Sequence, residues 1–131
     1  MKKLIVLTLL FFLSAAKNFA QEIHVTIDGQ AAPSVKDRTV IVGKNNLLSN
    51  ARLVVVPNIG TVQSFDMSML PVRGEYAGPT SSKSAEMTEE HKTWIKRCKY
   101  GDRFFFENIT LKLRDGRIKH LDSAAFIVLI Q

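Results

Sequence analysis

The last third of the chain, from Thr88 to Gln131, constrains the fold most, because it predicts one helix followed by three strands. Thr88 is typical of a helix N-cap, and two acidic residues follow it where the helix dipole favours negative charge. Apolar side chains then recur at helical spacing with basic residues around them. This stripe consists of His91, Trp94, Ile95 and Cys98. Lysines followed by Gly101 indicate the end of the helix, so we expect it over about residues 88–99.

The residues after this helix predict antiparallel strands joined by a tight turn. Arg103 to Glu107 is rich in phenylalanine, and Ala124 to Ile130 is an unbroken apolar run. Between them, apolar and polar side chains alternate up to Asp115-Gly116, a dipeptide that favours a two-residue hairpin turn. The apolar positions of this alternation are Ile109, Leu111 and Leu113.

This hairpin provides the candidate binding residues. A two-residue turn would set Arg114 opposite Arg117 and Lys112 opposite Lys119, with the apolar side chains on the other face. Directly opposed like charges destabilise an isolated hairpin by a few tenths of a kcal/mol each. Two explanations stay open. Either nearby acidic residues, water and salt neutralise the basic face, or it binds an acidic surface of another protein and the repulsion is relieved on binding.

The N-terminus has the pattern of a cleavable signal peptide. A positively charged start, Met1 to Lys3, precedes an apolar run from Leu4 to Leu13 that is too short to span a bilayer. We therefore expect a signal peptide over residues 1–20, a single mature domain over 21–131, a periplasmic or secreted location and no retained membrane anchor. Cleavage would lower the net charge from +6 to +3, which does not argue for binding to nucleic acid.

The region before the helix predicts further strands. We expect them at 23–27, 40–42, 53–56 and 61–72, with a short helical turn at 47–50. Val62 is out of phase with the alternation that follows it, which predicts a bulge. The stretch from Arg73 to Met87 reads as a long loop with a strand around 75–77, and it is either a partner contact or a mobile connection. About seven strands and one helix indicate an immunoglobulin-like β-sandwich with an inserted helix.

No motif in the sequence indicates catalysis, a metal or a cofactor. The three histidines share no ligand spacing with each other or with the cysteine, and no Gly-x-Ser-x-Gly elbow is present. Cys98 is the single cysteine, so no internal disulfide can form. Its place on the helix stripe favours a buried, inert thiol over a reactive one. The sequence therefore predicts a protein that is not an enzyme.

The order of elements in the second half of the chain resembles the C-terminal periplasmic domain of the gliding motility protein GldM. The likeness covers roughly residues 53–128. Its markers are the helix start at Thr88, the Gly101-Asp102 corner, Phe106 to Ile109, the Asp115-Gly116 hairpin and the final apolar strand. Ser64 to Met67 is similar to a strand of that family that contains Phe-Asp.

The resemblance implies an immunoglobulin-like β domain in the periplasm that binds other envelope proteins within a type IX secretion or gliding machinery. The expected signal peptide and the single domain depart from the family's membrane-anchored, multidomain plan, so an accessory binding module is the leading hypothesis. The alternative is an exported small ligand-binding or inhibitor-like domain that uses the Arg73 to Met87 loop.

Overall fold

The computed structural model describes residues 22–34 and 36–131. The predicted signal peptide, residues 1–20, lies outside the described residues. Within the part that is described, no helix is long and apolar enough to cross a membrane.

The described residues form eight strands, two short α-helices and one turn of 3-10 helix. In chain order the elements are β1 (His24–Ile27), β2 (Thr39–Val42), α2 (Lys44–Ser49), β3 (Leu53–Val56), β4 (Gly60–Leu70), β5 (Ala77–Ser82), α3 (Glu89–Arg97), β6 (Arg103–Leu113), β7 (Ile118–Leu121), η1 (Asp122–Ala124) and β8 (Phe126–Ile130).

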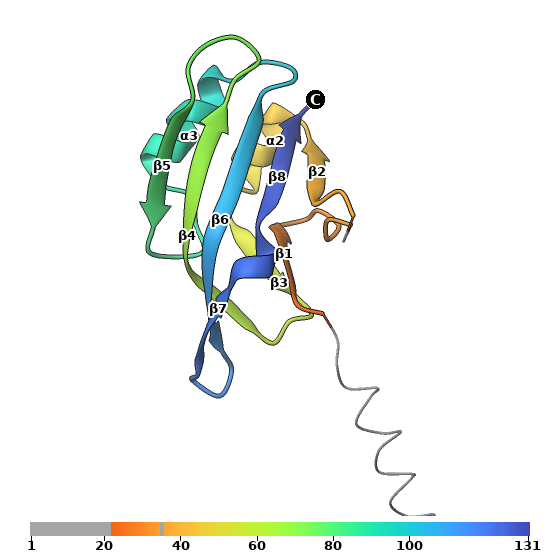
Figure 1. Cartoon of the computed structure of the whole chain (residues 1–131), viewed down its shortest axis with the longest axis vertical. Helices are drawn as coiled ribbons and strands as arrows, with labels where there is room; N and C mark the ends of the chain where they lie inside the picture. The colour runs from red at the N-terminus through yellow and green to blue at the C-terminus, as the bar shows by residue number, and fades with distance from the viewer. Residues whose placement is uncertain (1–21, 35) are drawn as a thin grey trace, which may run out of the picture.

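The strands divide into a six-stranded and a two-stranded sheet. The larger sheet has the order β2-β8-β6-β4-β5, and β7 pairs with β6 beyond the end of β8. All its pairings are antiparallel except that of β2 with β8, which is parallel. The smaller sheet joins β1 and β3 antiparallel. In Figure 1 the larger sheet faces the viewer, and α2, α3 and β3 lie behind it.

The core lies between the six-stranded sheet and the elements that cover this one face. Alternate side chains of the sheet point inward, as the two-residue period of a strand requires. The largest of them are four fully or almost fully buried phenylalanines: Phe65, Phe104, Phe106 and Phe126. Leu47 of α2, Ile95 of α3 and Val25 of β1 belong to the same apolar cluster. Each such side chain contributes about 1.5–3 kcal/mol by leaving water.

Most of the elements predicted from the sequence are confirmed, with shifted boundaries. The predicted helix over 88–99 is α3, which begins at Glu89 after its N-cap Thr88 and ends at Arg97. The strand at 53–56 is β3, and the bulge near Val62 is present as a register shift between β4 and β6. The strand expected at 75–77 is wrong, because β5 runs over Ala77–Ser82.

The predicted fold class is confirmed at the level of a mainly β protein. The helix count differs, since the helical turn expected at 47–50 is a second α-helix, α2, that starts earlier in the chain. The sheets hold two and six strands, and the larger one is mixed. The immunoglobulin-like arrangement stays a prediction.

Candidate functional site

The hairpin that carries the four candidate binding residues has a different register from the one predicted. Leu111 pairs with Lys119 and Lys112 pairs with Ile118. Leu113 N donates to Arg117 O at 2.8 Å, and Gly116 N donates to Leu113 O at 2.9 Å. These bonds close a three-residue loop in which Gly116, with φ of 90°, takes the left-handed position of a bulge. The two-residue turn was therefore the wrong prediction.

This one-residue shift redistributes the positive charges. Directly opposed strand residues share a face, so Lys112 lies with Ile118 and Lys119 lies with Leu111 on opposite faces of the hairpin. The predicted pairs of opposed like charges are absent from this hairpin. All four basic side chains are nevertheless exposed. The hairpin extends beyond the rest of the sheet at the lower end of Figure 1. The four basic residues lie within and on either side of its turn.

Asp115 fixes the conformation of the tip. Its Oδ1 accepts from the Arg117 backbone N–H at 3.0 Å, and its Oδ2 accepts from Arg117 Nε at 2.6 Å. The backbone hydrogen bond from Arg117, with that from its guanidinium, holds the pKa of Asp115 below its usual value. The positive charge of Arg117 is thus compensated by Asp115 within the turn. Lys112, Arg114 and Lys119 form no ion pair with any described side chain.

A pocket of about 450 Å³ lies at the base of the hairpin, between β1, β7 and η1. It brings together the two histidines that the sequence left unassigned. His24 Nε2 lies 3.5 Å from Glu22 Oε2, and His120 Nε2 lies 3.0 Å from Asp122 Oδ1. Lys119 also lines this pocket. No local sequence pattern predicts this pocket, because the pairing of β1 with β3 and of β7 with β6 decides which segments meet there.

His120 also connects a hydroxyl to a carboxylate. Thr110 Oγ1 lies 3.1 Å from His120 Nδ1, and the other ring nitrogen faces Asp122. A catalytic triad has this order of groups, but its acid is buried and holds the imidazole in place. The Asp122 side chain is 91 % exposed and that of His120 is 49 % exposed. Water competes for both contacts, so this chain of groups is not preorganised for nucleophilic catalysis.

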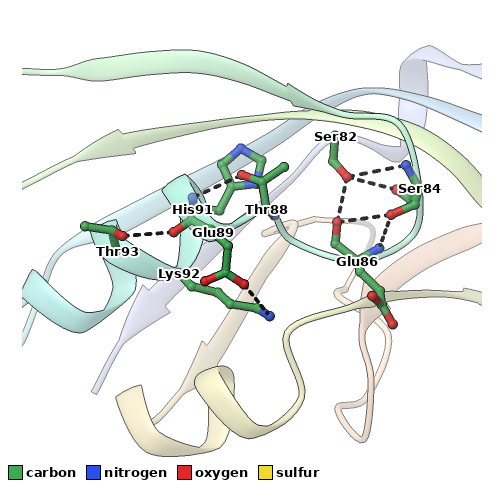
Figure 2. A network of polar contacts seen from close by, with 8 residues as sticks. All are labelled: Ser82, Ser84, Glu86, Thr88, Glu89, His91, Lys92 and Thr93. Atoms are coloured by element: carbon green, nitrogen blue, oxygen red, sulfur yellow. Dashed lines mark hydrogen bonds and ion pairs between the residues drawn. The ribbon is translucent and has the colours of Figure 1, made fainter.

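The stretch from Arg73 to Met87 contains a strand of the larger sheet. β5 fills its centre, and a serine network closes the turn that follows (Figure 2). Ser82 Oγ donates to Glu86 O at 2.6 Å, and the Glu86 backbone N–H donates to Ser84 Oγ at 3.1 Å. Ser82 is buried at 2 % exposure. The side chains thus supply the hydrogen bonds that regular structure would otherwise provide, and they fix the path of the chain into α3.

His91 anchors α3 to β5. Its backbone N–H donates to Thr88 Oγ1, while its Nδ1 accepts from the Thr88 backbone N–H, each at 3.2 Å (Figure 2). Its Nε2 donates to Thr80 O at 2.9 Å. These partners require a neutral ring with the proton on Nε2. Burial lowers the pKa of His91, against the opposing effect of the Thr80 carbonyl. The sequence placed His91 on the apolar stripe of this helix, and its side chain is fully buried.

Cys98 is buried, as its place on the helix stripe predicted. Burial raises the pKa of its thiol, and nearby Lys44 opposes this only in part. A protonated, covered thiol is a poor nucleophile. Among the described residues, no group of three or more histidine, cysteine, aspartate or glutamate side chains is placed to hold a metal ion.

A second pocket, of about 460 Å³, lies at the opposite end of the sheet from the hairpin. Apolar side chains that follow β4 form one wall, including Val72, which is 66 % exposed. Arg73, Arg97 and Lys99 border it. Asp102 joins the two sides, because its carboxylate accepts from the backbone N–H groups of Val72 at 2.9 Å and Lys99 at 2.8 Å. The Asp102 carboxylate is thus already hydrogen-bonded to the backbone. The other charged residues that line the pocket are all basic.

No model of a protein family matches the chain, and no curated protein matches it in sequence. The resemblance to the GldM family therefore stays a prediction.

Proposed function

We propose that the chain is an exported, non-enzymatic protein-binding module whose basic hairpin contacts an acidic surface of another envelope protein. The single observation that carries this proposal is the projecting tip of β6 and β7. Its four exposed basic side chains lie within eight residues of sequence. Of these, only Arg117 is compensated by an acid among the described residues. Several positive charges on one projecting hairpin favour fast association with a surface of negative charge.

The corrected register changes the physical basis of this proposal. Because like charges no longer face each other across the hairpin, binding does not gain energy by relieving their repulsion. The gain comes instead from bringing Lys112, Arg114 and Lys119 near acids of the partner. Such exposed contacts contribute more to the rate and selectivity of binding than to its strength.

The proposed context is the periplasm, as an accessory component of a type IX secretion or gliding machinery. The order of elements shared with the GldM C-terminal domain supports this context, as does the apolar run at the N-terminus. The same resemblance supports an immunoglobulin-like relation between the sheets. The exposed Asp122 and the protonated Cys98 support a role without catalysis.

The test is co-purification from native envelope with Lys112 and Lys119 both changed to Glu. We expect the partner protein to be lost while the domain stays folded. The matched control changes Lys83 and Lys96, two exposed lysines away from the hairpin, to Glu and should retain the partner. Retention of the same partner by the hairpin variant would refute the hairpin as the binding site.

The pocket edged by Arg73, Arg97 and Lys99 favours a second candidate function. An exported domain that binds a small anionic ligand would use this pocket at the start of the Arg73 to Met87 stretch. Arg97→Glu should then weaken binding of the ligand without affecting partners that contact the hairpin. A small acid that co-purifies with the domain and is lost from this variant would favour this alternative.

A further inference from the structure

One face of the six-stranded sheet has no layer packed against it within the described residues. The covering elements α2, α3 and β3 all lie on the other face (Figure 1). The centre of the open face is apolar: Phe105 of β6 pairs with Ile127 of β8, and in the next row Leu129 pairs with Ile41 of β2. The Ile41 side chain is 56 % exposed. An apolar surface of this kind on a small domain is a frequent interaction site.

Opposite charges lie at the two ends of this apolar centre. Arg103 and Glu107 point to the same face as Phe105, because each is two residues from Phe105 along β6. At about 3.3 Å per residue the two charges are about 13 Å apart. Both are exposed, and neither forms an ion pair with a described side chain.

The acidic end contains a directly opposed pair of like charges. Glu107 pairs with Asp66 of β4. Asp66 accepts hydrogen bonds from Ser81 Oγ at 2.5 Å and Asn108 Nδ2 at 3.1 Å. Lys36 and Arg38 line the hollow beside Glu107, but no described cation forms an ion pair with either acid. Opposed acids destabilise a sheet, so a cation brought to this end would be stabilising.

A second copy of the chain can supply that cation, and the charges select how it must dock. Two identical faces stack about a two-fold axis that lies between the sheets. An axis along the strands would set Arg103 against Arg103 of the second copy. An axis across the strands at Phe105 sets Arg103 of each copy against Glu107 of the other, twice. For Arg103 and Glu107, only the second arrangement brings opposite charges together.

The shape of the face agrees with the same axis. A hollow of about 280 Å³ lies on the Glu107 side of Phe105, bordered by residues 36–38 before β2 and by Ala125 before β8. The exposed Ile41 and its neighbour Leu129 lie on the Arg103 side of the same two strands. Rotation about the axis across the strands carries these two apolar side chains of one copy over the hollow of the other.

We propose that two copies of this chain pack their open sheet faces together about this axis and form a four-layered dimer. The aligned packing of two twisted sheets permits it. Five strands about 4.8 Å apart, with about five residues each, give a flat footprint of about 400 Å² per copy. This is small for a specific interface, so we expect a weak, transient dimer with a dissociation constant of roughly micromolar or higher. The dimer does not depend on the function proposed for the hairpin, which remains free at the end of the sheet.

Charge reversal at the two ends tests the proposal by sedimentation velocity over a range of concentrations. Protein is produced from the full sequence so that any natural processing takes place. Arg103→Glu and Glu107→Arg should each raise the dimer dissociation constant by about tenfold or more, since each introduces two like-charge contacts. The double variant should restore dimerisation to near the wild-type level. Lys96→Glu, on the exposed side of α3, is the matched control and should leave the constant unchanged.

Thermal unfolding of every variant shows whether it folds. Restoration in the double variant supports the isologous contact, because a structural defect from either change would persist in it. A wild-type chain that stays monomeric well above micromolar concentrations would overturn the proposal. So would folded single variants that dimerise as the wild type does, or a folded double variant that remains monomeric. Ile41→Thr, which removes an apolar contact without altering charge, should also weaken the dimer.

Discussion

The two ends of β6 belong to different environments, although one strand forms both. At the first end, β6 lies between β4 and β8, and Phe104 and Phe106 are fully buried. At the other end, β6 pairs with β4 and β7, and the hairpin projects into solvent with its basic residues (Figure 1). The comparison assigns folding stability to the buried end of β6 and recognition of a partner to the exposed end. Substitutions at the first end should affect folding, and those at the second should affect binding.

The largest effect is expected for Phe106→Ala at the buried end. The Phe106 ring stacks on Phe126 with centroids 4.8 Å apart and lies 5.8 Å from Phe65. Loss of this side chain leaves a cavity within a close-packed core, so we expect a destabilisation of about 3–5 kcal/mol. Urea unfolding at protein concentrations below the micromolar range, where the proposed dimer would be dissociated, measures this loss. Phe105→Ala, on the open face, is the control and should cost clearly less; equal losses would contradict the distinction between the two faces.

The sequence predicted this buried end well because its signals are local. Helical spacing, the cap at Thr88 and the phenylalanine-rich strand act over a few residues, and each is confirmed in α3 and β6. His91 shows the limit of such signals. Its spacing placed it on the helix stripe, but its bond to Thr80 depends on where β5 lies.

The hairpin end was predicted less well because its register depends on one backbone conformation. Asp115-Gly116 fits both a two-residue turn and a three-residue loop with a glycine bulge. The structure has the second, and the single-residue shift moves Lys112 and Lys119 to opposite faces. The pocket that joins His24 to His120 and the parallel pairing of β2 with β8 depend on contacts between distant segments, for which this sequence carries no local pattern.

The next largest effect is a loss of folding stability at acidic pH, caused by the buried His91. Because burial lowers the pKa of His91, the unfolded chain binds more protons than the folded one as the pH falls below about 6.5, the ordinary pKa of histidine. Stability should therefore be complete above that pH and decrease as the pH falls toward the pKa of the folded state. Protonation of Nδ1 also removes the acceptor of the Thr88 backbone N–H. Urea unfolding as a function of pH measures the slope.

His91→Gln is the control for this pH dependence. The variant lacks the titrating ring, so it should lose the part of the slope between pH 7.5 and pH 5.5 that the wild type shows. An identical slope in the two proteins would assign the acid sensitivity to other groups and contradict the role given to His91.

A smaller effect is expected for Gly116→Ala at the tip of the hairpin. A Cβ at this position meets no atom within 4 Å, so the cost comes only from the positive φ of 90°. We expect a loss of about 1 kcal/mol. Gly29→Ala is the matched comparison, because Gly29 also has a positive φ, of 78°, and no atom within 4 Å of the added Cβ, so it should lose about as much stability. A negligible loss at Gly116 beside a clear loss at Gly29 would indicate that the tip does not have the bulged conformation.

The smallest effect on stability is expected for the charges of the hairpin, and it distinguishes the two registers. In the predicted two-residue turn, Lys112→Glu would face Lys119 and gain a favourable cross-strand pair. In the observed register Lys112 lies opposite Ile118, and Lys119 lies on the other face. Each single change to Glu should therefore alter stability by no more than about 0.5 kcal/mol. The double-mutant cycle should give a coupling energy near zero, whereas a coupling of several tenths of a kcal/mol would restore the two-residue turn and the single basic face that it implies.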